Sequence, residues 1–481
     1  MANSFQDKEL EILREAVDKS EKRLAKKVVQ SPEVKRMIII VENFLRNKKL
    51  VCYGGTAINN ILPVNEQFYD KNLEIPDYDF FSPNALKDAK LLADMYVKAG
   101  YTEVEAKSGV HHGTYKVFVN YIPVADITFL VPSLFKAISK EAIIVHGIRY
   151  APPNYLRMAM YLELSRPAGD VSRWEKVLKR LILLNNAYPM RNPRCNAINF
   201  QRDFEEGLEN EKRDIYFLVR DVLIDQGVIF FGGYASTLYG RHMPAKQRRQ
   251  LAQVPDFDVL SEKPEECAEK VKDTLTKHLY EKVKMVRHDA IGEIIPEHFE
   301  VKVSDQTVCF VYTPVACHSY NTITISNKQV NVATIDTILS FYLAFIYADR
   351  TYYNADRLLC MAQYLFTVQA KNRLNQKGLL KRFSINCYGT QPTLEDLRGA
   401  KANKYEELKD KRNSKEFEEH FLKYAPAKMR KTNKASVQGN RASVKGNRVS
   451  VKGNSKSAHS KSAQSKSTSA KSHRKTQKKK P

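Results

Sequence analysis

The feature that most constrains this sequence is a short apolar run followed by two glycines. Residues 50–53 have the character of a buried strand, and Gly54 and Gly55 follow directly, before Thr56 and an apolar turn typical of a helix start. Glycine lets a backbone approach a phosphate, and the first N–H groups of a helix can bind an anion. The pattern indicates a phosphate-binding turn, although two glycines after an apolar run also mark ordinary turns.

Paired aspartates lie in the next apolar run, residues 76–81. Asp77 and Asp79 share one face of the predicted strand, because side chains alternate along a strand, and Tyr78 then points into the core. Two carboxylates on a rigid strand can hold divalent cations. The 22 positions from Gly55 to Asp77 predict an inserted loop at residues 63–73.

A third aspartate, Asp126, lies inside a strand predicted at residues 122–130, after an alternating strand at 114–120. A carboxylate in an otherwise apolar strand is costly unless it is paired or bound to a metal. Two interpretations follow from the residues alone. Asp126 either faces water on an edge strand or is the third carboxylate of the site that Asp77 and Asp79 begin.

Helical periodicity surrounds these strands. We expect an exposed amphipathic helix at residues 6–29, a helix that Ser31 caps, a helix at 83–100 and helical structure at 152–190. In the last of these, Arg173, Lys176 and Arg180 are three and four positions apart and share one helix face. Such a stripe is a solvated face in most helices, and beside a triphosphate it would be a phosphate clamp.

The chain then repeats itself. Residues 228–238 copy the glycine turn, and Asp256 and Asp258 copy the paired aspartates after a gap of 23 positions instead of 22. Residues 311–317 align with 119–126 when one residue is omitted, and this alignment places Cys317 at the position of Asp126. Replacing a hard oxygen ligand by a thiol should remove most magnesium chemistry. The second copy is therefore expected to be structural or RNA-binding, while residual metal binding at Asp256 and Asp258 stays open.

The formal net charge of +24 is concentrated at the C-terminal end. Residues 428–481 contain 17 of the 78 Lys and Arg residues and no Asp or Glu, which leaves 61 basic and 54 acidic residues elsewhere. Serine, lysine and Gly-Asn units recur in this segment without an apolar face, so we expect a disordered basic tail. Its charge suits a polyanionic partner or serves only to keep the protein in solution.

Other features exclude several classes of protein. No run of 18 or more apolar residues occurs, so we expect no membrane-spanning helix, and the first residues contain no apolar signal region, so we expect no secretion. The seven cysteines have no C-x-x-C spacing. A zinc site or a disulfide framework is therefore not expected, and a reducing compartment fits. The cysteines are Cys52, Cys195, Cys267, Cys309, Cys317, Cys360 and Cys387.

The order of strand, Gly-Gly, helix and Asp-x-Asp resembles the signature of polymerase-β-type nucleotidyltransferases. Four motifs together look like the poly(A) polymerase catalytic subunit of large cytoplasmic DNA viruses, including giant amoebal viruses, asfarviruses and, more distantly, poxviruses. The resemblance covers roughly residues 30–390. The motifs occupy residues 53–59, 76–81, 125–128 and 165–177.

The resemblance implies transfer of AMP from ATP to the 3′ hydroxyl of an RNA, with two Mg²⁺ or Mn²⁺ ions. It implies that Asp77, Asp79 and Asp126 are the catalytic, metal-binding carboxylates. It also implies that Gly54, Gly55 and Thr56 approach the β- and γ-phosphates, and that Lys176, with Arg173, neutralises the triphosphate. It implies a cytoplasmic setting in the viral factory, is compatible with packaging in the virion, and leaves a homodimer or a separate processivity subunit open.

The predicted fold class is α+β, with tandem polymerase-β-type nucleotidyltransferase domains of which the second is degenerate. Two rival functions remain: another RNA terminal nucleotidyltransferase, and a non-catalytic RNA-binding scaffold. The predicted segments are an N-terminal helix at 1–30, a catalytic domain at 31–200, a degenerate domain at 201–390, a helical segment at 391–427 and the basic tail at 428–481.

Overall fold

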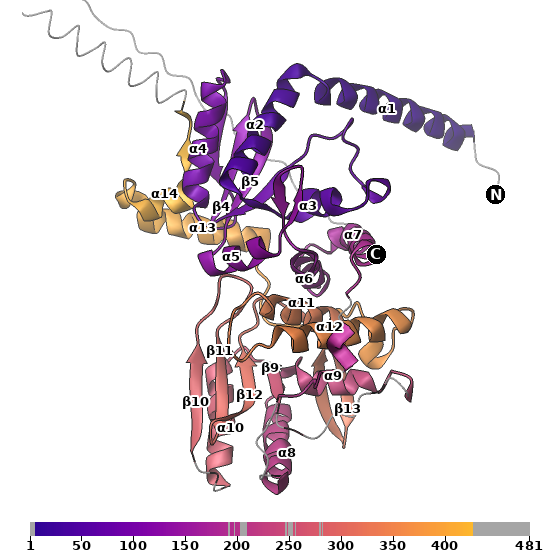
Figure 1. Ribbon diagram of the computed structural model, residues 1–481, viewed down its shortest axis with the longest axis vertical. Helices are drawn as coiled ribbons and strands as arrows, with labels where there is room; N and C mark the ends of the chain where they lie inside the picture. Colours follow the sequence, from indigo (N-terminus) through magenta and orange to yellow (C-terminus); the bar gives the residue numbers. More distant parts are fainter. Residues whose placement is uncertain are drawn as a thin grey trace, which may run out of the picture. The chain divides into compact units, whose positions relative to one another are not determined.

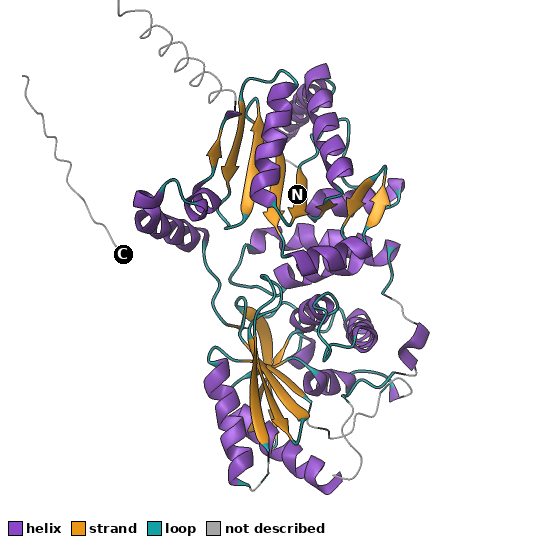
Figure 2. Ribbon diagram, turned by 60° about the vertical axis from the view of Figure 1, so that its left-hand side comes forward, coloured by secondary structure: helices purple, strands orange, loops and turns teal. Residues whose placement is uncertain are grey.

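The computed structural model describes residues 5–190, 193–196, 198–202, 209–245, 248, 254, 256–278, 280 and 282–426. Within these residues the chain forms two mixed β-sheets, with helices packed around and between them (Figures 1 and 2). The predicted tail at 428–481 lies outside the described residues. No described helix has both the length and the apolar character that crossing a membrane requires.

The first sheet comes from the first half of the chain and one late strand. Its order in the described residues is β16-β3-β4-β5-β2-β1-β7-β6. The strands are β1 (Val51–Cys52), β2 (Tyr78–Ser82), β3 (Val104–Ser108), β4 (Thr114–Val119), β5 (Ile122–Phe129), β6 (Ile143–Val145), β7 (Ile148–Tyr150) and β16 (Lys423–Tyr424).

The second sheet lies in the second half, in the order β10-β11-β12-β9-β8-β14-β13-β15. Its strands are β8 (Ile229–Phe230), β9 (Phe257–Leu260), β10 (Val283–His288), β11 (His298–Val303), β12 (Gln306–Tyr312), β13 (His318–Ile325), β14 (Lys328–Ala333) and β15 (Cys387–Tyr388).

The two sheets are copies of one topology. Without β16 and β15, the order β3-β4-β5-β2-β1-β7-β6 corresponds strand for strand to β10-β11-β12-β9-β8-β14-β13. The central pairs also agree in direction: β1 is antiparallel to β2 as β8 is to β9, and β2 is parallel to β5 as β9 is to β12. The repeat inferred from the sequence is therefore present in the fold.

Helices of the first half frame the first sheet. The predicted cap is present, because the Ser31 hydroxyl accepts the Val34 N–H at the start of α2. The predicted insert is a loop that contains one short 3₁₀ turn, η1 (Val64–Glu66). The helices are α1 (Phe5–Val29), α2 (Pro32–Lys48), α3 (Gly54–Ile61), α4 (Ala85–Lys98), α5 (Pro132–Lys140), α6 (Pro153–Leu164) and α7 (Trp174–Ala187), with the 3₁₀ turn η2 (Val171–Arg173) before α7.

A helical layer joins the two halves. Every residue of α11 is buried, and α11 packs against α6 of the first half and α12 of the second. Tyr155 and Tyr347 cross this junction with ring centroids 5.5 Å apart. The later helices are α8 (Glu209–Asp225), α9 (Gly233–Gly240), α10 (Pro264–Lys277), α11 (Ile335–Phe345), α12 (Ala355–Lys371), α13 (Leu394–Leu408) and α14 (Lys415–Phe421), with 3₁₀ turns η3 (Pro193–Asn196), η5 (Gly378–Leu380) and η6 (Lys409–Lys411).

The cysteine prediction was wrong. Cys195 and Cys360 form one disulfide across 165 residues of sequence, and Cys317 and Cys387 form another across 70. Local spacing could not reveal either pair, because only the folded second half brings the partners together. The remaining cysteines, Cys52, Cys267 and Cys309, are buried thiols.

Candidate active site

The glycine turn joins β1 to α3, and other side chains closely approach both of its glycines. Gly54 has φ +71°, and a Cβ added there would lie 2.6 Å from Asp79 Oδ2. A Cβ on Gly55 would lie 2.5 Å from the Tyr69 hydroxyl oxygen and 2.9 Å from Arg180 Nη1. The turn therefore lies between a carboxylate on one side and a guanidinium on the other, and at Gly54 both the space and the positive φ favour glycine.

The structure brings the three predicted carboxylates together. Asp77 immediately precedes β2, and Asp79 within β2 is the direct partner of Asp126 on the parallel strand β5. Burial, followed by the charges of Asp77 and Asp126, raises the pKa of Asp79 to about 7. Burial and the charge of Asp126 also raise the pKa of Asp77. Three carboxylates thus repel one another on two neighbouring strands.

Lys116 on β4 accompanies the third carboxylate. Its ammonium forms an ion pair with Asp126 Oδ2, while Asp126 Oδ1 is buried without a hydrogen-bond partner. In the part of the chain that the structure describes, no group of three or more His, Cys, Asp or Glu side chains is arranged to hold a metal ion. The donors nevertheless suit a divalent cation, because they are hard carboxylate oxygens, they repel one another, and one oxygen of Asp126 is unsatisfied.

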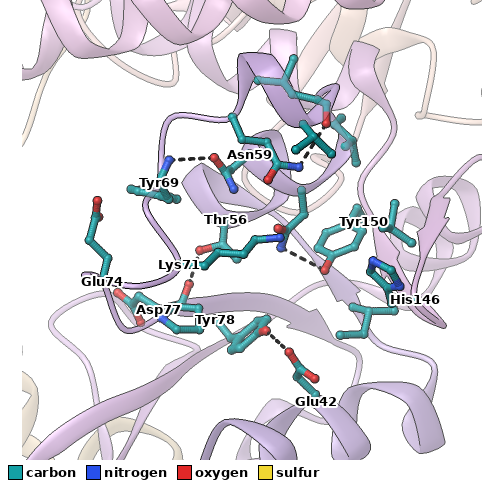
Figure 3. A pocket seen from close by; sticks show the side chains of 18 of the residues that line it. Glu42, Thr56, Asn59, Tyr69, Lys71, Glu74, Asp77, Tyr78, His146 and Tyr150 are labelled. Carbon is teal, nitrogen blue, oxygen red and sulfur yellow. Dashed lines mark hydrogen bonds between the residues drawn. The ribbon is translucent and has the colours of Figure 1, made fainter. Parts of the chain in front are cut away.

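The Thr56 hydroxyl makes a hydrogen bond within the protein. Its hydroxyl donates to the carbonyl oxygen of Asp77 at 2.6 Å, and the side chain is buried (Figure 3). The hydroxyl proton is therefore already used to hold α3 against the start of β2. The phosphate contacts expected from Thr56 and from the backbone N–H groups of the glycine turn stay predictions.

A cavity of about 890 Å³ lies beneath the inserted loop (Figure 3). Thr56, Tyr69 and Asp77 belong both to its wall and to the candidate site. Most of the remaining lining comes from α2, α3, the inserted loop and the β6–β7 hairpin. The inserted loop therefore forms a wall that reaches from this cavity to the glycine turn.

The basic stripe of the sequence divides into three environments. Arg173 lies in η2 and pairs with Glu163 at 3.2 Å, and Lys176 is exposed on α7. Arg173 still acts electrostatically on Asp79, whose pKa it lowers. Arg180 instead lies against Gly55, where its guanidinium receives support from Phe68 and Tyr69 of the inserted loop. The periodicity could group these three cations but could not show which one meets the glycine turn.

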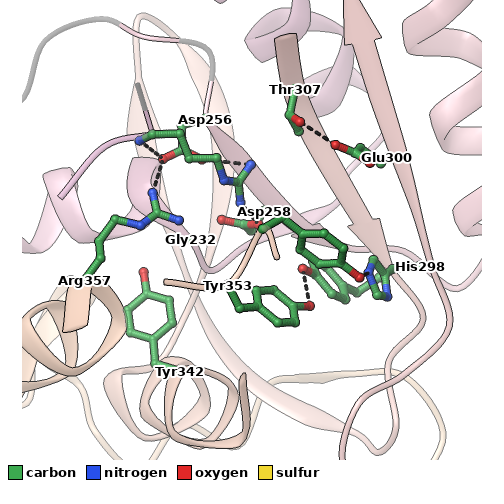
Figure 4. A network of polar contacts seen from close by, with 12 residues as sticks. Gly232, Asp256, Asp258, His298, Glu300, Thr307, Tyr342, Tyr353 and Arg357 are labelled. Atoms are coloured by element: carbon green, nitrogen blue, oxygen red, sulfur yellow. Dashed lines mark hydrogen bonds and ion pairs between the residues drawn. The ribbon is translucent and has the colours of Figure 1, made fainter. Parts of the chain in front are cut away.

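In the second copy, arginine side chains pair with the two aspartates and neutralise their charge. Arg202 forms ion pairs with Asp256 at 3.0 Å and Asp258 at 2.8 Å, and Arg357 approaches Asp256 at 3.5 Å (Figure 4). The Arg202 guanidinium also lies 4.5 Å from the centroid of the Phe310 ring. Burial lowers the pKa of Arg202, but the two carboxylates outweigh this effect and raise it. Arginines occupy the position at which the first copy offers its carboxylates to a ligand.

The predicted counterpart of Asp126 was also wrong. The parallel pair β9–β12 sets Asp258 opposite Phe310, as β2–β5 sets Asp79 opposite Asp126. Cys317 lies beyond the end of β12 and is bonded to Cys387. The second copy therefore has a phenylalanine where the first has its third carboxylate, and this change is more severe than the predicted thiol.

Comparisons with known proteins agree with these features. Residues 39–170 match the family model of the poly(A) polymerase catalytic subunit. A candidate poly(A) polymerase catalytic subunit of African swine fever virus (strain Badajoz 1971 Vero-adapted) is 30% identical over 171 residues, which are 34% of this chain and 36% of that protein. One from Acanthamoeba polyphaga mimivirus is 28% identical over 252 residues, 50% of this chain and 41% of that protein.

The fold comparison extends further than the sequence comparisons. The crystal structure of the Megavirus polyadenylate synthase superposes with a TM-score of 0.74 and 19% identity, covering 93% of this chain and 91% of that one. This likeness shows the fold of both halves. The sequence matches, in contrast, span about two fifths or less of the curated relatives' lengths. The match at 39–170 contains the glycine turn and all three carboxylates.

Proposed function

We propose that this chain is a template-independent poly(A) polymerase that adds AMP from ATP to the 3′ hydroxyl of an RNA. The observation that carries the proposal is the meeting of Asp77, Asp79 and Asp126 beside the Gly54–Gly55 turn, within the segment that matches the catalytic-subunit model. Nucleotidyl transfer needs this combination. The carboxylates must hold cations beside both the attacking hydroxyl and the leaving pyrophosphate, and the glycine backbone must leave room for the phosphates.

The carboxylates would hold the divalent cations. Asp77 and Asp79 would bind both ions, and Asp126 would complete the site nearer the RNA 3′ hydroxyl. Two bound Mg²⁺ or Mn²⁺ ions would supply charge neutralisation at the triphosphate and a lowered pKa of the attacking hydroxyl. Lys116 forms an ion pair with Asp126, and this pair would have to open before both oxygens of Asp126 could bind a cation.

Basic and backbone groups would bind the triphosphate from the opposite side. The N–H groups at the start of α3 lie at the glycine turn, and a helix start favours anions. Arg173 and Lys176 remain proposed contributors to the charge around the phosphates. The second copy, with its aspartates already neutralised, would serve as scaffold and would not catalyse.

Primer extension tests this proposal directly. Purified protein, an unstructured RNA primer and Mg²⁺ or Mn²⁺ would be incubated with each NTP separately, for wild type, Asp79→Asn, Asp258→Asn and the exposed control Asp305→Asn. We expect long tails with ATP alone from wild type and the control. Asp79→Asn should abolish them, and Asp258→Asn should retain them at temperatures where its thermal melt shows folded protein.

The other outcomes identify the rival functions. Extension with every NTP would indicate a broader terminal nucleotidyltransferase. No extension by wild type with any NTP, although RNA still binds, would contradict the catalytic proposal and favour an RNA-binding scaffold.

A further inference from the structure

We propose that Arg180 is the residue that binds the triphosphate of the incoming nucleotide, and that the inserted loop at residues 63–73 positions it there. The inference rests on the proposed function, because it concerns the same site. Its first support is proximity. A Cβ added to Gly55 would lie closest to two side-chain atoms, the Tyr69 hydroxyl oxygen at 2.5 Å and Arg180 Nη1 at 2.9 Å. A phosphate drawn to the glycine turn would therefore meet this guanidinium.

The inserted loop holds Arg180 in a fixed orientation. Arg180 Nη2 donates to the Tyr69 hydroxyl at 2.7 Å, and the guanidinium carbon lies 4.7 Å and 5.4 Å from the ring centroids of Phe68 and Tyr69. The two aromatic rings thus fix the plane of the guanidinium by cation–π contact. One donor faces Tyr69, and the others stay available for an anion, since arginine has five.

The loop in turn is fixed by the helix that it covers. The Oδ1 atom of Asn59, a buried residue of α3, accepts the backbone N–H groups of Phe68 at 2.8 Å and Tyr69 at 2.9 Å. α3 therefore anchors the loop, and the loop places Arg180 over the first turn of α3. The long spacing between Gly55 and Asp77, which departs from a minimal nucleotidyltransferase motif, has a specific structural use.

The electrostatics favour an anionic ligand for Arg180. Among the described residues no carboxylate forms an ion pair with Arg180, whereas Arg173 on the same side is already paired with Glu163. A partly buried arginine with this geometry matches phosphate oxygens, because the planar fork donates two parallel hydrogen bonds. Arg180 is thus assigned a contact with the β- or γ-phosphate, and Tyr69 is assigned as a positioning residue.

Four variants separate this role from a structural one. They are Arg180→Gln, Arg180→Lys, Tyr69→Phe and the control Lys179→Gln, which alters an exposed neighbour paired with Glu175. The first measurement is the Kd of ATP with Mg²⁺ by calorimetry in the absence of RNA, so that no acceptor is present. The second is the KM for ATP and for the RNA primer, and the third is the thermal melting temperature.

We expect Arg180→Gln to weaken ATP binding and raise the KM for ATP about 10- to 100-fold, the range for losing hydrogen bonds to a charged group. Arg180→Lys should recover part of this loss, Tyr69→Phe should show a smaller increase in the same two constants, and the control should match wild type. The KM for RNA should stay within twofold throughout.

Unchanged ATP affinity in folded Arg180→Gln, with only a lower melting temperature, would overturn the assignment and leave a structural brace. If Arg180→Gln does not fold, Tyr69→Phe decides, because it removes only one hydroxyl: an unchanged Kd for ATP would overturn the positioning role. Failure of the proposed function is distinguishable. It would appear as wild-type protein that binds ATP without extending any primer, in which case a loss of ATP binding in Arg180→Gln still supports this assignment.

Discussion

Asp79 is expected to destabilise the metal-free protein, so replacing it by asparagine should stabilise the fold while abolishing activity. Burial and the neighbouring charges of Asp77 and Asp126 raise its pKa from 3.8 to about 7. A group whose pKa is higher in the folded than in the unfolded state loses stabilising free energy as the pH rises through that interval. Asparagine has nearly the same shape and cannot ionise, so it avoids this loss.

The magnitude follows from the shift. Roughly three pKa units at about 1.4 kcal/mol each correspond to a difference of about 4 kcal/mol in the free energy of unfolding at pH 8. Below about pH 3, where Asp79 is largely protonated in both the folded and the unfolded state, the two proteins should be nearly equal in stability. The difference should therefore open between about pH 3 and pH 8, with Asp79→Asn the more stable.

The assay is urea unfolding of both proteins in EDTA at several pH values, with Asp305→Asn as an exposed control. Adding Mn²⁺ should stabilise wild type more than Asp79→Asn, because only wild type retains the complete carboxylate set. A variant that is equally stable as, or less stable than, wild type at pH 8 in EDTA would refute the reasoning. It would show that Asp79 is not repelled by its neighbours in the metal-free fold.

Three further predictions concern other parts of the molecule. Gly54→Ala, with φ +71° and a Cβ 2.6 Å from Asp79 Oδ2, should reduce kcat/KM in primer extension more than about 100-fold, with melting lowered by only a few degrees. Arg202→Met should lower the free energy of unfolding by about 3–5 kcal/mol in urea titration, because it leaves Asp258 unpaired and Asp256 with only its 3.5 Å contact to Arg357, and asparagines in place of both carboxylates should recover much of this loss. Cys360→Ser should lower the free energy of unfolding by up to about 5 kcal/mol, because it removes a disulfide that spans 165 residues of sequence. Dithiothreitol should then destabilise the variant less than it destabilises wild type.

The sequence was informative where one local pattern carried the chemistry. Strand, glycine turn and paired aspartates are all local features, and their repetition at similar spacing predicted the duplicated topology that the two sheets share. The residues alone left Asp126 either on an edge strand or at the site of Asp79; the family resemblance favoured the site, and the register of β2 and β5 sets Asp126 opposite Asp79. Its role as a metal ligand stays a prediction.

The sequence was uninformative where tertiary register decides. A β-bulge between Val117 and Phe118 shifts the β4–β5 pairing, so counting back from the turn would set Lys116 opposite Ala125 instead of Asp126. The assignment of Cys317 failed because tertiary register was again unknown. The alignment by residue similarity matched the loop after β12 with the strand that contains Asp126.

Other interactions depend on segments that contain no motif. Arg202 reaches the second pair of aspartates from outside the repeated pattern. Arg180 was grouped with its two neighbours by periodicity, yet only the inserted loop selects it for the glycine turn.

The two copies show two solutions to one electrostatic problem. A fold that sets two aspartates on a buried strand must neutralise them, because paired buried carboxylates are costly when they stand alone. The second copy does so with its own chain, through the ion pairs of Arg202 with both aspartates and the Phe310 ring beside its guanidinium, although burial still raises the pKa of Asp258. The first copy leaves Asp77 and Asp79 with raised pKa values and one oxygen of Asp126 unsatisfied. That residual repulsion is the physical basis of the proposed cation binding, and an internal arginine like Arg202 of the second copy would remove it.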